Sequence, residues 1–293
     1  MSTPHDEPLP RDTYADAPAG ADAPDPDSPP WGVSTAIFVW LASVALMYFL
    51  PVFFILPYLA YKSGAEGFAR INEAMRDDPL VLLIGVAATV PIHLLTLLIV
   101  WAVVTGPGLR AFGPTVGMSW GRYFGFWRSV LAALLLLGAA SAVAQLIGVR
   151  RTPFDEMLES STAALFATAF LATATAPLVE ELVYRGVLYP ALRRAAGAVF
   201  AVAAVTALFS AVHFYQYQTS PGTIAAIVLL SLALTVVRAA SGSVLPGIVI
   251  HLVFNGVQVV WLVYGYLRTG KVGGEAAVSA VTLLDRMRPA FFN

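Results

Sequence analysis

The sequence predicts an all-α fold, a polytopic bundle of transmembrane helices with about seven spans and a range of six to eight. Of its residues, 58% are hydrophobic and 12% are charged, and the mean hydropathy is +0.75. A soluble domain carries roughly 25% charged residues, so most of this chain is expected to lie in lipid. Apolar runs of about 20 residues, the length that crosses a bilayer, recur between short polar segments.

The composition also excludes several classes of function. The net charge of −1 gives no basic footprint, so a nucleic-acid partner is not expected. The chain contains no cysteine, which excludes disulfides, thiolate metal sites and a cysteine nucleophile.

The first half of the chain predicts a tail followed by transmembrane helices. Residues 1–30 are rich in Pro, Ala and Asp, and such a segment buries too little apolar surface to offset the entropy of ordering it. We therefore expect a disordered acidic tail at 1–30 and the amino-terminal transmembrane helices at 31–150. The expected spans there are 31–61, 79–105 and 127–149. Pro51 and Pro57 predict a kink or an interfacial end near Pro57 in the first span.

Four further spans are expected in the second half. They are 163–185, 198–214, 223–237 and 244–267. Residues 186–197 contain Arg193 and Arg194 and are interpreted as too polar to span. A polar tail is expected at 268–293, and no soluble second domain is indicated.

Ionisable residues end the fourth apolar run at Glu180, Glu181 and Arg185. Charges at membrane depth cost about 2.5–3.5 kcal/mol each on insertion scales, so they indicate a function by default. Adjacent helical residues point about 100° apart, so the two carboxylates cannot both face one pocket. Glu181 and Arg185 are four residues apart and can pair, which leaves Glu180 as the freer carboxylate and candidate base. The alternative is an ion cluster in the headgroup region.

Two later runs carry polar residues of the same kind. His213 ends the fifth run, and His251 and Asn255 lie four residues apart on one face of the seventh. An imidazole and a carboxamide together can donate hydrogen bonds to a developing oxyanion. They can equally form an interhelical hydrogen-bonded pair. His93, in the second span, has no partner motif and is expected to be structural.

A metal site is the competing chemistry. Glu180, His213 and His251 are an adequate set of zinc ligands in principle, although the helical HExxH motif is absent. The cofactor is therefore left open between a zinc-like divalent metal and none. A span that ends at Arg185 places Glu180 near one face, whereas His213 lies roughly 22 Å along its own helix. The two meet only if the first helix continues past Arg185 or if 186–197 folds back towards the midplane.

Three motifs follow one another on successive apolar segments: EExxxR at 180–185, FxxxH at 209–213 and HxxxN at 251–255. Their order resembles that of the CPBP family of intramembrane proteases, which includes type II CAAX prenyl endopeptidases and bacteriocin-processing and immunity-associated proteins. The resemblance covers residues 163–258, the expected protease core. Many relatives carry Arg-x-Gly-Ser before the last histidine. Here Gly242 and Ser243 fit that spacing, but Arg238 stands two residues too early.

The resemblance implies a role for each motif residue. Glu180 would activate the attacking water with help from His213, and His251 and Asn255 would stabilise the oxyanion. The supporting residues would be Glu181, Arg185 and Phe209. The family is described as a metalloprotease family, and a metal-free glutamate mechanism is also described for its CAAX members.

The leading hypothesis is a multi-pass endopeptidase of the cell membrane. Its substrate would be a membrane-associated or lipidated, CAAX-like peptide or protein, prenylated or not, and its other partner is the lipid bilayer. A non-catalytic membrane binding or immunity-type protein could use the same polar pocket. A transporter would favour inverted repeats and paired broken helices, and the sequence shows neither.

Overall fold

The computed structural model describes residues 25–63, 78–121 and 123–269. The elements in these ranges are α1 (Val33–Ser63), α4 (Pro79–Ala87), α5 (Thr89–Thr105), α6 (Phe112–Val116), α7 (Phe126–Ile147), α8 (Pro153–Ser160), α9 (Thr162–Phe170), η1 (Leu171–Thr175), α10 (Ala176–Glu181), η2 (Leu182–Leu188), α11 (Tyr189–Ala196), α12 (Ala198–Tyr217), α13 (Pro221–Ser241) and α14 (Leu245–Thr269). All are helical, and 7 segments within them are long and apolar enough to cross a membrane. The predicted fold class is confirmed.

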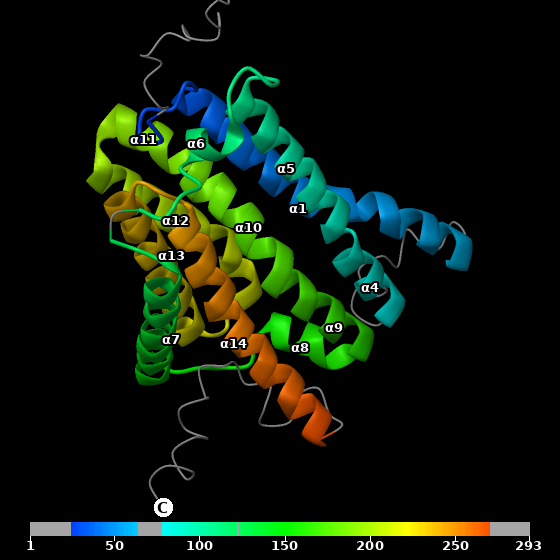
Figure 1. Cartoon of the computed structure of the whole chain (residues 1–293). Coiled ribbons are helices and arrows are strands. Elements are labelled where there is room, and N and C mark those ends of the chain that lie inside the picture. The colour runs from blue at the N-terminus through cyan, green and yellow to red at the C-terminus, as the bar shows by residue number, and fades with distance from the viewer. Residues whose placement is uncertain (1–24, 64–77, 122, 270–293) are drawn as a thin grey trace, which may run out of the picture.

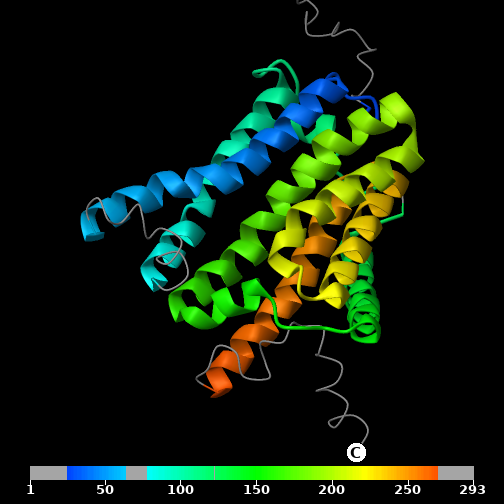
Figure 2. The ribbon, with the colours of Figure 1, turned by 180° about the vertical axis from the view of Figure 1, so that it is seen from behind.

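A long helical path through the middle of the molecule organises the other helices. It consists of α9, η1, α10, η2 and α11 in succession (Figure 1). Seen from both sides, α1, α4 and α5 lie on one flank of this path, and α7, α12, α13 and α14 lie on the other (Figures 1 and 2). The central path therefore contacts both halves of the bundle.

The predicted end of the fourth span at Arg185 is wrong. The central path is continuous from Thr162 to Ala196, 35 residues, and its side chains are buried from Glu181 to Leu192. Residues 186–197 were misread because Arg193 and Arg194 lower their mean hydropathy. Both arginines lie in the last turn of α11, so the rest of this segment is an apolar helix.

The first π-helical segment of this path follows from Pro177. In η1 the N–H of Ala176 bonds to the carbonyl of Leu171, five residues back. In that register the next residue, Pro177, would bond to the carbonyl of Ala172, but proline has no N–H. The side chain of Asn255 on α14 donates to this carbonyl instead, with Nδ2 3.0 Å from the oxygen.

The second π-helical segment repeats this arrangement at Pro190. In η2 the N–H of Tyr189 bonds to the carbonyl of Tyr184, again five residues back. Pro190 cannot continue the register to the carbonyl of Arg185. Arg238 on α13 donates its Nε to that oxygen at 3.1 Å. Each proline thus leaves one carbonyl free inside the bundle, and a side chain of another helix satisfies it.

The turn at Gly197 brings Glu180 and His213 to the same depth. Gly197 has φ +84°, a conformation that favours glycine, and it reverses the chain between α11 and α12. Glu180 lies 17 residues before Gly197 and His213 lies 16 residues after it. Two antiparallel helical segments of similar length therefore carry the two residues to similar depths. The depth problem raised by the sequence is resolved by the continuation of the helix past Arg185.

Proline also shapes the amino-terminal flank. The expected span 79–105 is divided into α4 and α5 at Ala88, since the ring of Pro91 disturbs the bond to the carbonyl four residues back. The expected span 31–61 is one helix, α1, which continues through Pro51 and Pro57 to Ser63.

Six residues of the predicted tail take part in the described structure. Residues 25–30 form a turn in which Asp27 pairs with Arg193 and Arg238, so the boundary at residue 30 differs from the structure. Asp27 is held in this turn because it supplies the counter-charge for a buried and a partly buried arginine. Residues 1–24 lie outside the described ranges, as do 270–293 of the predicted carboxyl-terminal tail.

Candidate active site

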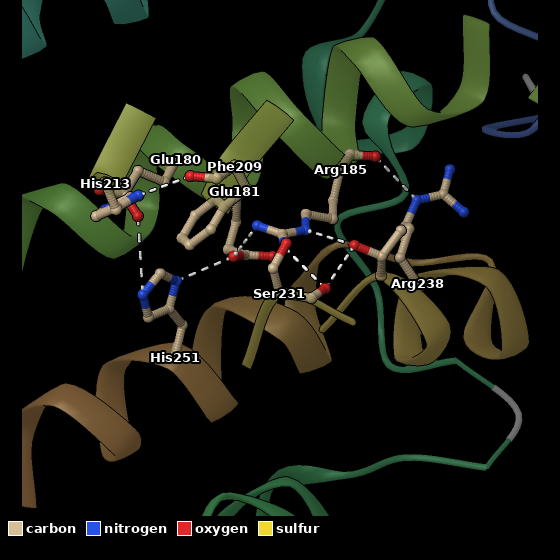
Figure 3. Close-up of polar contacts among 9 residues, drawn as sticks. Glu180, Glu181, Arg185, Phe209, His213, Ser231, Arg238 and His251 are labelled. Atoms are coloured by element: carbon tan, nitrogen blue, oxygen red, sulfur yellow. Dashed lines mark hydrogen bonds and ion pairs between the residues drawn. The ribbon is translucent and has the colours of Figure 1, made fainter. Parts of the chain in front are cut away.

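Glu181 is the structural carboxylate of the site. Its side chain is fully buried, and Oε1 lies 3.0 Å from Arg185 Nη1 and 3.0 Å from His251 Nδ1 (Figure 3). The predicted pairing with Arg185 is confirmed. Oε2 has no hydrogen-bond partner among the described residues, and it lies so close to Gly247 that a Cβ there would be 2.9 Å away. Oε1 is therefore fixed by two polar contacts, and Oε2 is fixed by close packing against Gly247.

Arg185 also donates hydrogen bonds to two residues of α13. Its Nε donates to Thr235 Oγ1 at 3.2 Å, and its Nη2 donates to the carbonyl and Oγ of Ser231 at 3.1 and 2.8 Å. The guanidinium also lies over the ring of Phe209, 4.8 Å from the centroid. A buried charge is tolerated when it is paired and hydrogen-bonded in this way. Ser231 and Thr235 are not predicted from the sequence, although two hydroxyl residues four apart in an apolar run are a usable signal.

Glu180 is the freer carboxylate, as predicted. Its side chain is 26% exposed, and Oε2 lies 3.8 Å from His251 Nε2 (Figure 3). Its helix neighbour Glu181 points instead to Arg185, which agrees with the angle of about 100° between adjacent side chains. Glu180 thus presents a partly exposed carboxylate beside His251, halfway along a membrane-spanning helix.

His213 and His251 meet at the ring of Phe209. The His213 ring stacks on it with centroids 4.6 Å apart, and the His251 ring approaches it at 6.1 Å. His213 Nδ1 lies 2.8 Å from the Phe209 carbonyl, which can only accept. His251 Nδ1 likewise faces the Glu181 carboxylate. Both histidines are therefore protonated at Nδ1, and each has Nε2 left for chemistry.

Asn255 sits one helical turn beyond His251 and is bonded to the central path. One N–H of Nδ2 donates to the carbonyl of Ala172. The side-chain NH₂ group of Asn255 has a second N–H, which this hydrogen bond does not use. The structure thus brings His213 and His251 to the ring of Phe209, with Glu180 beside His251. Asn255 lies one turn further along α14, against η1.

His93 also reaches η1, from α5. It is buried, and its Nδ1 lies 2.8 Å from Thr175 Oγ1. The structural role predicted for His93 agrees with this contact. It links the amino-terminal flank to the segment that precedes Glu180.

Glu180, His213 and His251 are the candidate metal ligands. The Nδ1–H groups of both histidines bond to a carboxylate or a carbonyl, a pattern that metal-binding histidines share. Across residues 25–63, 78–121 and 123–269, however, no three His, Asp or Glu side chains come close enough together to hold a metal ion. The donor set of Glu180, His213 and His251 does not fit a metal in this arrangement.

The central path and its carboxyl-terminal partners match a known family. Residues 162–257 match the family described as type II CAAX prenyl endopeptidase Rce1-like. This part of the chain is therefore similar to that family, and it is here called the Rce1-like region. The match spans the central path, α12, α13 and half of α14, and it agrees with the resemblance drawn from the three motifs. It indicates a CAAX-type intramembrane protease, and the seven apolar segments indicate a multi-pass membrane protein. Comparison with curated proteins and with solved structures gives no match.

Proposed function

We propose that the protein is an intramembrane endopeptidase in which Glu180 activates a water molecule. The substrate would be a membrane-associated or lipidated, CAAX-like peptide, and the cell membrane its place of action. The observation that carries the proposal is the contrast between the two carboxylates. The Oε1 atom of the fully buried Glu181 is held by both Arg185 and His251, whereas Glu180 is 26% exposed and its Oε2 lies 3.8 Å from His251 Nε2.

The proposed reaction balances as an ordinary hydrolysis. Glu180 takes a proton from water, and the water oxygen attacks the peptide carbonyl carbon. The proton then passes from Glu180 to the amide nitrogen as the C–N bond breaks, giving a carboxylic acid and an amine. His213 Nε2, whose lone pair is free when Nδ1 carries the proton, can assist by accepting a hydrogen bond from the water.

The oxyanion would be stabilised from α14. His251 can donate from Nε2 when it carries a second proton, because its Nδ1 proton is held by Glu181. Glu180 and Glu181 on either side of the ring supply the counter-charge for that state. The remaining N–H of Asn255 would be the second donor. Residues 163–258 would thus form the catalytic core.

The test is peptidase activity of the purified protein in detergent, with prenylated and transmembrane peptides. Loss of a general base typically reduces turnover by about 10²–10⁴. We expect Glu180→Gln to lower turnover by about 10²-fold or more. The matched control is Glu156→Gln, the same change at an exposed glutamate of α8, which should keep full activity. Activity should persist with a chelator.

Other results would overturn the proposal. Cleavage that a chelator abolishes in the wild type would contradict the metal-free step. A wild type and a Glu180→Gln variant that are equally inert, while both keep a cellular phenotype, would favour the non-catalytic binding protein.

A further inference from the structure

We propose that Asp27 is a positioning residue of the active site, acting through Arg238 from outside the Rce1-like region. Residues 25–31, here called the amino-terminal strap, lie against α11 and the end of α13 (Figure 1). The role rests on the proposed function: the first of its two tests measures peptidase turnover, and the second does not need catalysis.

The strap is bound to the helix ends by several independent contacts. Asp27 pairs with Arg193, and Arg194 donates to the carbonyls of Pro29 and Trp31. Trp31 is buried, and its Nε1 donates to the carbonyl of Val187 in η2 at 3.0 Å. The strap is therefore part of the described fold and contacts the π-helical segment next to the site.

Arg238 connects the strap to that segment. Only 1% of its side chain is exposed. Its Nη1 lies 2.7 Å from Asp27 Oδ1, its Nη2 donates to the carbonyl of Pro26 at 2.9 Å, and its Nε donates to the carbonyl of Arg185 at 3.1 Å. Among the described residues, Asp27 is the acidic group that pairs with this guanidinium.

The carbonyl that Arg238 holds belongs to a residue of the site. Pro190 leaves the oxygen of Arg185 without its helical partner, and Arg238 replaces that partner. The side chain of the same Arg185 holds Glu181, and Glu181 holds His251 (Figure 3). Contacts thus run without a gap from Asp27 to the imidazole beside Glu180.

Neutralising Asp27 would leave the charge of Arg238 buried and unpaired, which is strongly unfavourable. Arg238 would then turn towards water or another acceptor and release the Arg185 carbonyl. The expected result is a site with its substrate contacts intact and its reacting groups misplaced. This predicts a lower kcat with little change in KM.

The first measurement is turnover of the full-length protein. Asp27→Asn should lower kcat by roughly 2- to 30-fold, the range found for residues that act on a site through others. Asp27→Glu, which keeps the charge, should recover part of the loss. Asp25→Asn is the matched control, because Asp25 lies in the same turn and its Oδ1 accepts from the N–H of Asp27, which asparagine can also do.

The second measurement does not depend on catalysis. The chain has no cysteine, so Glu180→Cys gives a single thiol at the site. Its rate of modification by a small methanethiosulfonate should change at least threefold when Asp27→Asn is added, and should not change with Asp25→Asn.

The outcomes separate this inference from the proposed function. A wild type that cleaves no peptide contradicts the proposed protease, and the thiol rate then decides the inference alone. Unchanged thiol rate and unchanged kcat in Asp27→Asn overturn the positioning role even if the enzyme is active. A strap variant that raises KM and leaves kcat unchanged overturns it as well.

Discussion

α1, α4 and α5 pack against the central path mainly through apolar side chains, whereas α10 to α14 also contact one another through buried charges. The outer half of α1 belongs to a small cluster with α4, made of Ile55, Leu59 and Val81. The ion pair between Lys62 of α1 and Asp78, which precedes α4, lies at the exposed end of α1. In the Rce1-like region, Glu181, Arg185, Arg238 and His251 are all buried and bonded.

The apolar flank and the polar core differ in how strictly they fix the relative positions of their helices. Apolar helices in lipid can slide or rotate against each other at small cost, since lipid tails are as apolar as leucine. A buried charge with four fixed partners has one arrangement that satisfies it, so the polar core fixes the rotation of three helices together. Catalytic groups need such a frame, because a misplacement of about 1 Å can cost about 10²-fold in rate.

The largest expected effect comes from breaking the polar core at Arg185. Arg185→Met leaves Glu181 buried without its cation, and breaking a buried pair in this way costs about 3–5 kcal/mol. The free energy of unfolding, measured by denaturation in mixed micelles, should fall by that amount. The double variant Arg185→Met with Glu181→Leu should recover much of the loss, because replacing both charges by apolar groups is often neutral. A double variant no more stable than Arg185→Met would contradict the pairing.

A smaller effect is expected at Gly247. In Gly247→Ala the new Cβ would lie 2.9 Å from Glu181 Oε2, so the carboxylate must shift and His251 with it. Overpacking of this kind costs about 1–3 kcal/mol, and peptidase activity should fall in parallel. Gly256→Ala on the same helix is the control, since its Cβ would meet Thr173 Cγ2 at 3.4 Å. Equal behaviour of the two variants would show that Gly247 has no special place.

A still smaller effect separates the observed contact of Asn255 with η1 from its proposed role as a donor to the oxyanion. Asn255→Leu removes the donor to the Ala172 carbonyl, and such bonds in membrane bundles average about 0.6 kcal/mol. Pro177→Ala restores a backbone N–H that can bond to this carbonyl. Adding it to Asn255→Leu should therefore recover thermal stability but not peptidase activity. Recovery of both would mean that Asn255 acts by supporting η1 and not by contacting the substrate.

The smallest effect is expected in the amino-terminal flank. The hydrogen bond from Lys62 lowers the pKa of Asp78, so this contact stabilises the fold above the ordinary pKa of an aspartate and is lost as the pH falls through the lowered value. Asp78→Asn keeps an N-cap for α4 and should shift the thermal midpoint only slightly at pH 7. As the pH falls through that lowered pKa, the unfolding temperatures of the variant and the wild type should converge. A variant shift as large as that of Gly247→Ala would contradict the comparison between the two regions.

The sequence by itself determined the class of the fold and the polar residues of the three motifs. Long apolar runs can satisfy their backbone in lipid only as helices, so composition and run length suffice to predict a helical bundle. The pairing of Glu181 with Arg185 also followed from local geometry, because residues four apart on a helix share a face. Glu180 emerged as the freer carboxylate for the same reason.

Tertiary structure alone decided how those groups meet. Hydropathy predicts that the fourth helix ends at Arg185, because a hydropathy scale treats every charged side chain as exposed. It contains no information on the hydrogen bonds that Arg185 donates to Ser231 and Thr235 on another helix. It also placed Asp27 in a disordered tail, because the arginine that Asp27 neutralises stands 211 residues away. Partners so distant in sequence leave no periodic pattern. The continuous central helix and the ordered strap exist because charges from three separate segments satisfy one another in the folded chain.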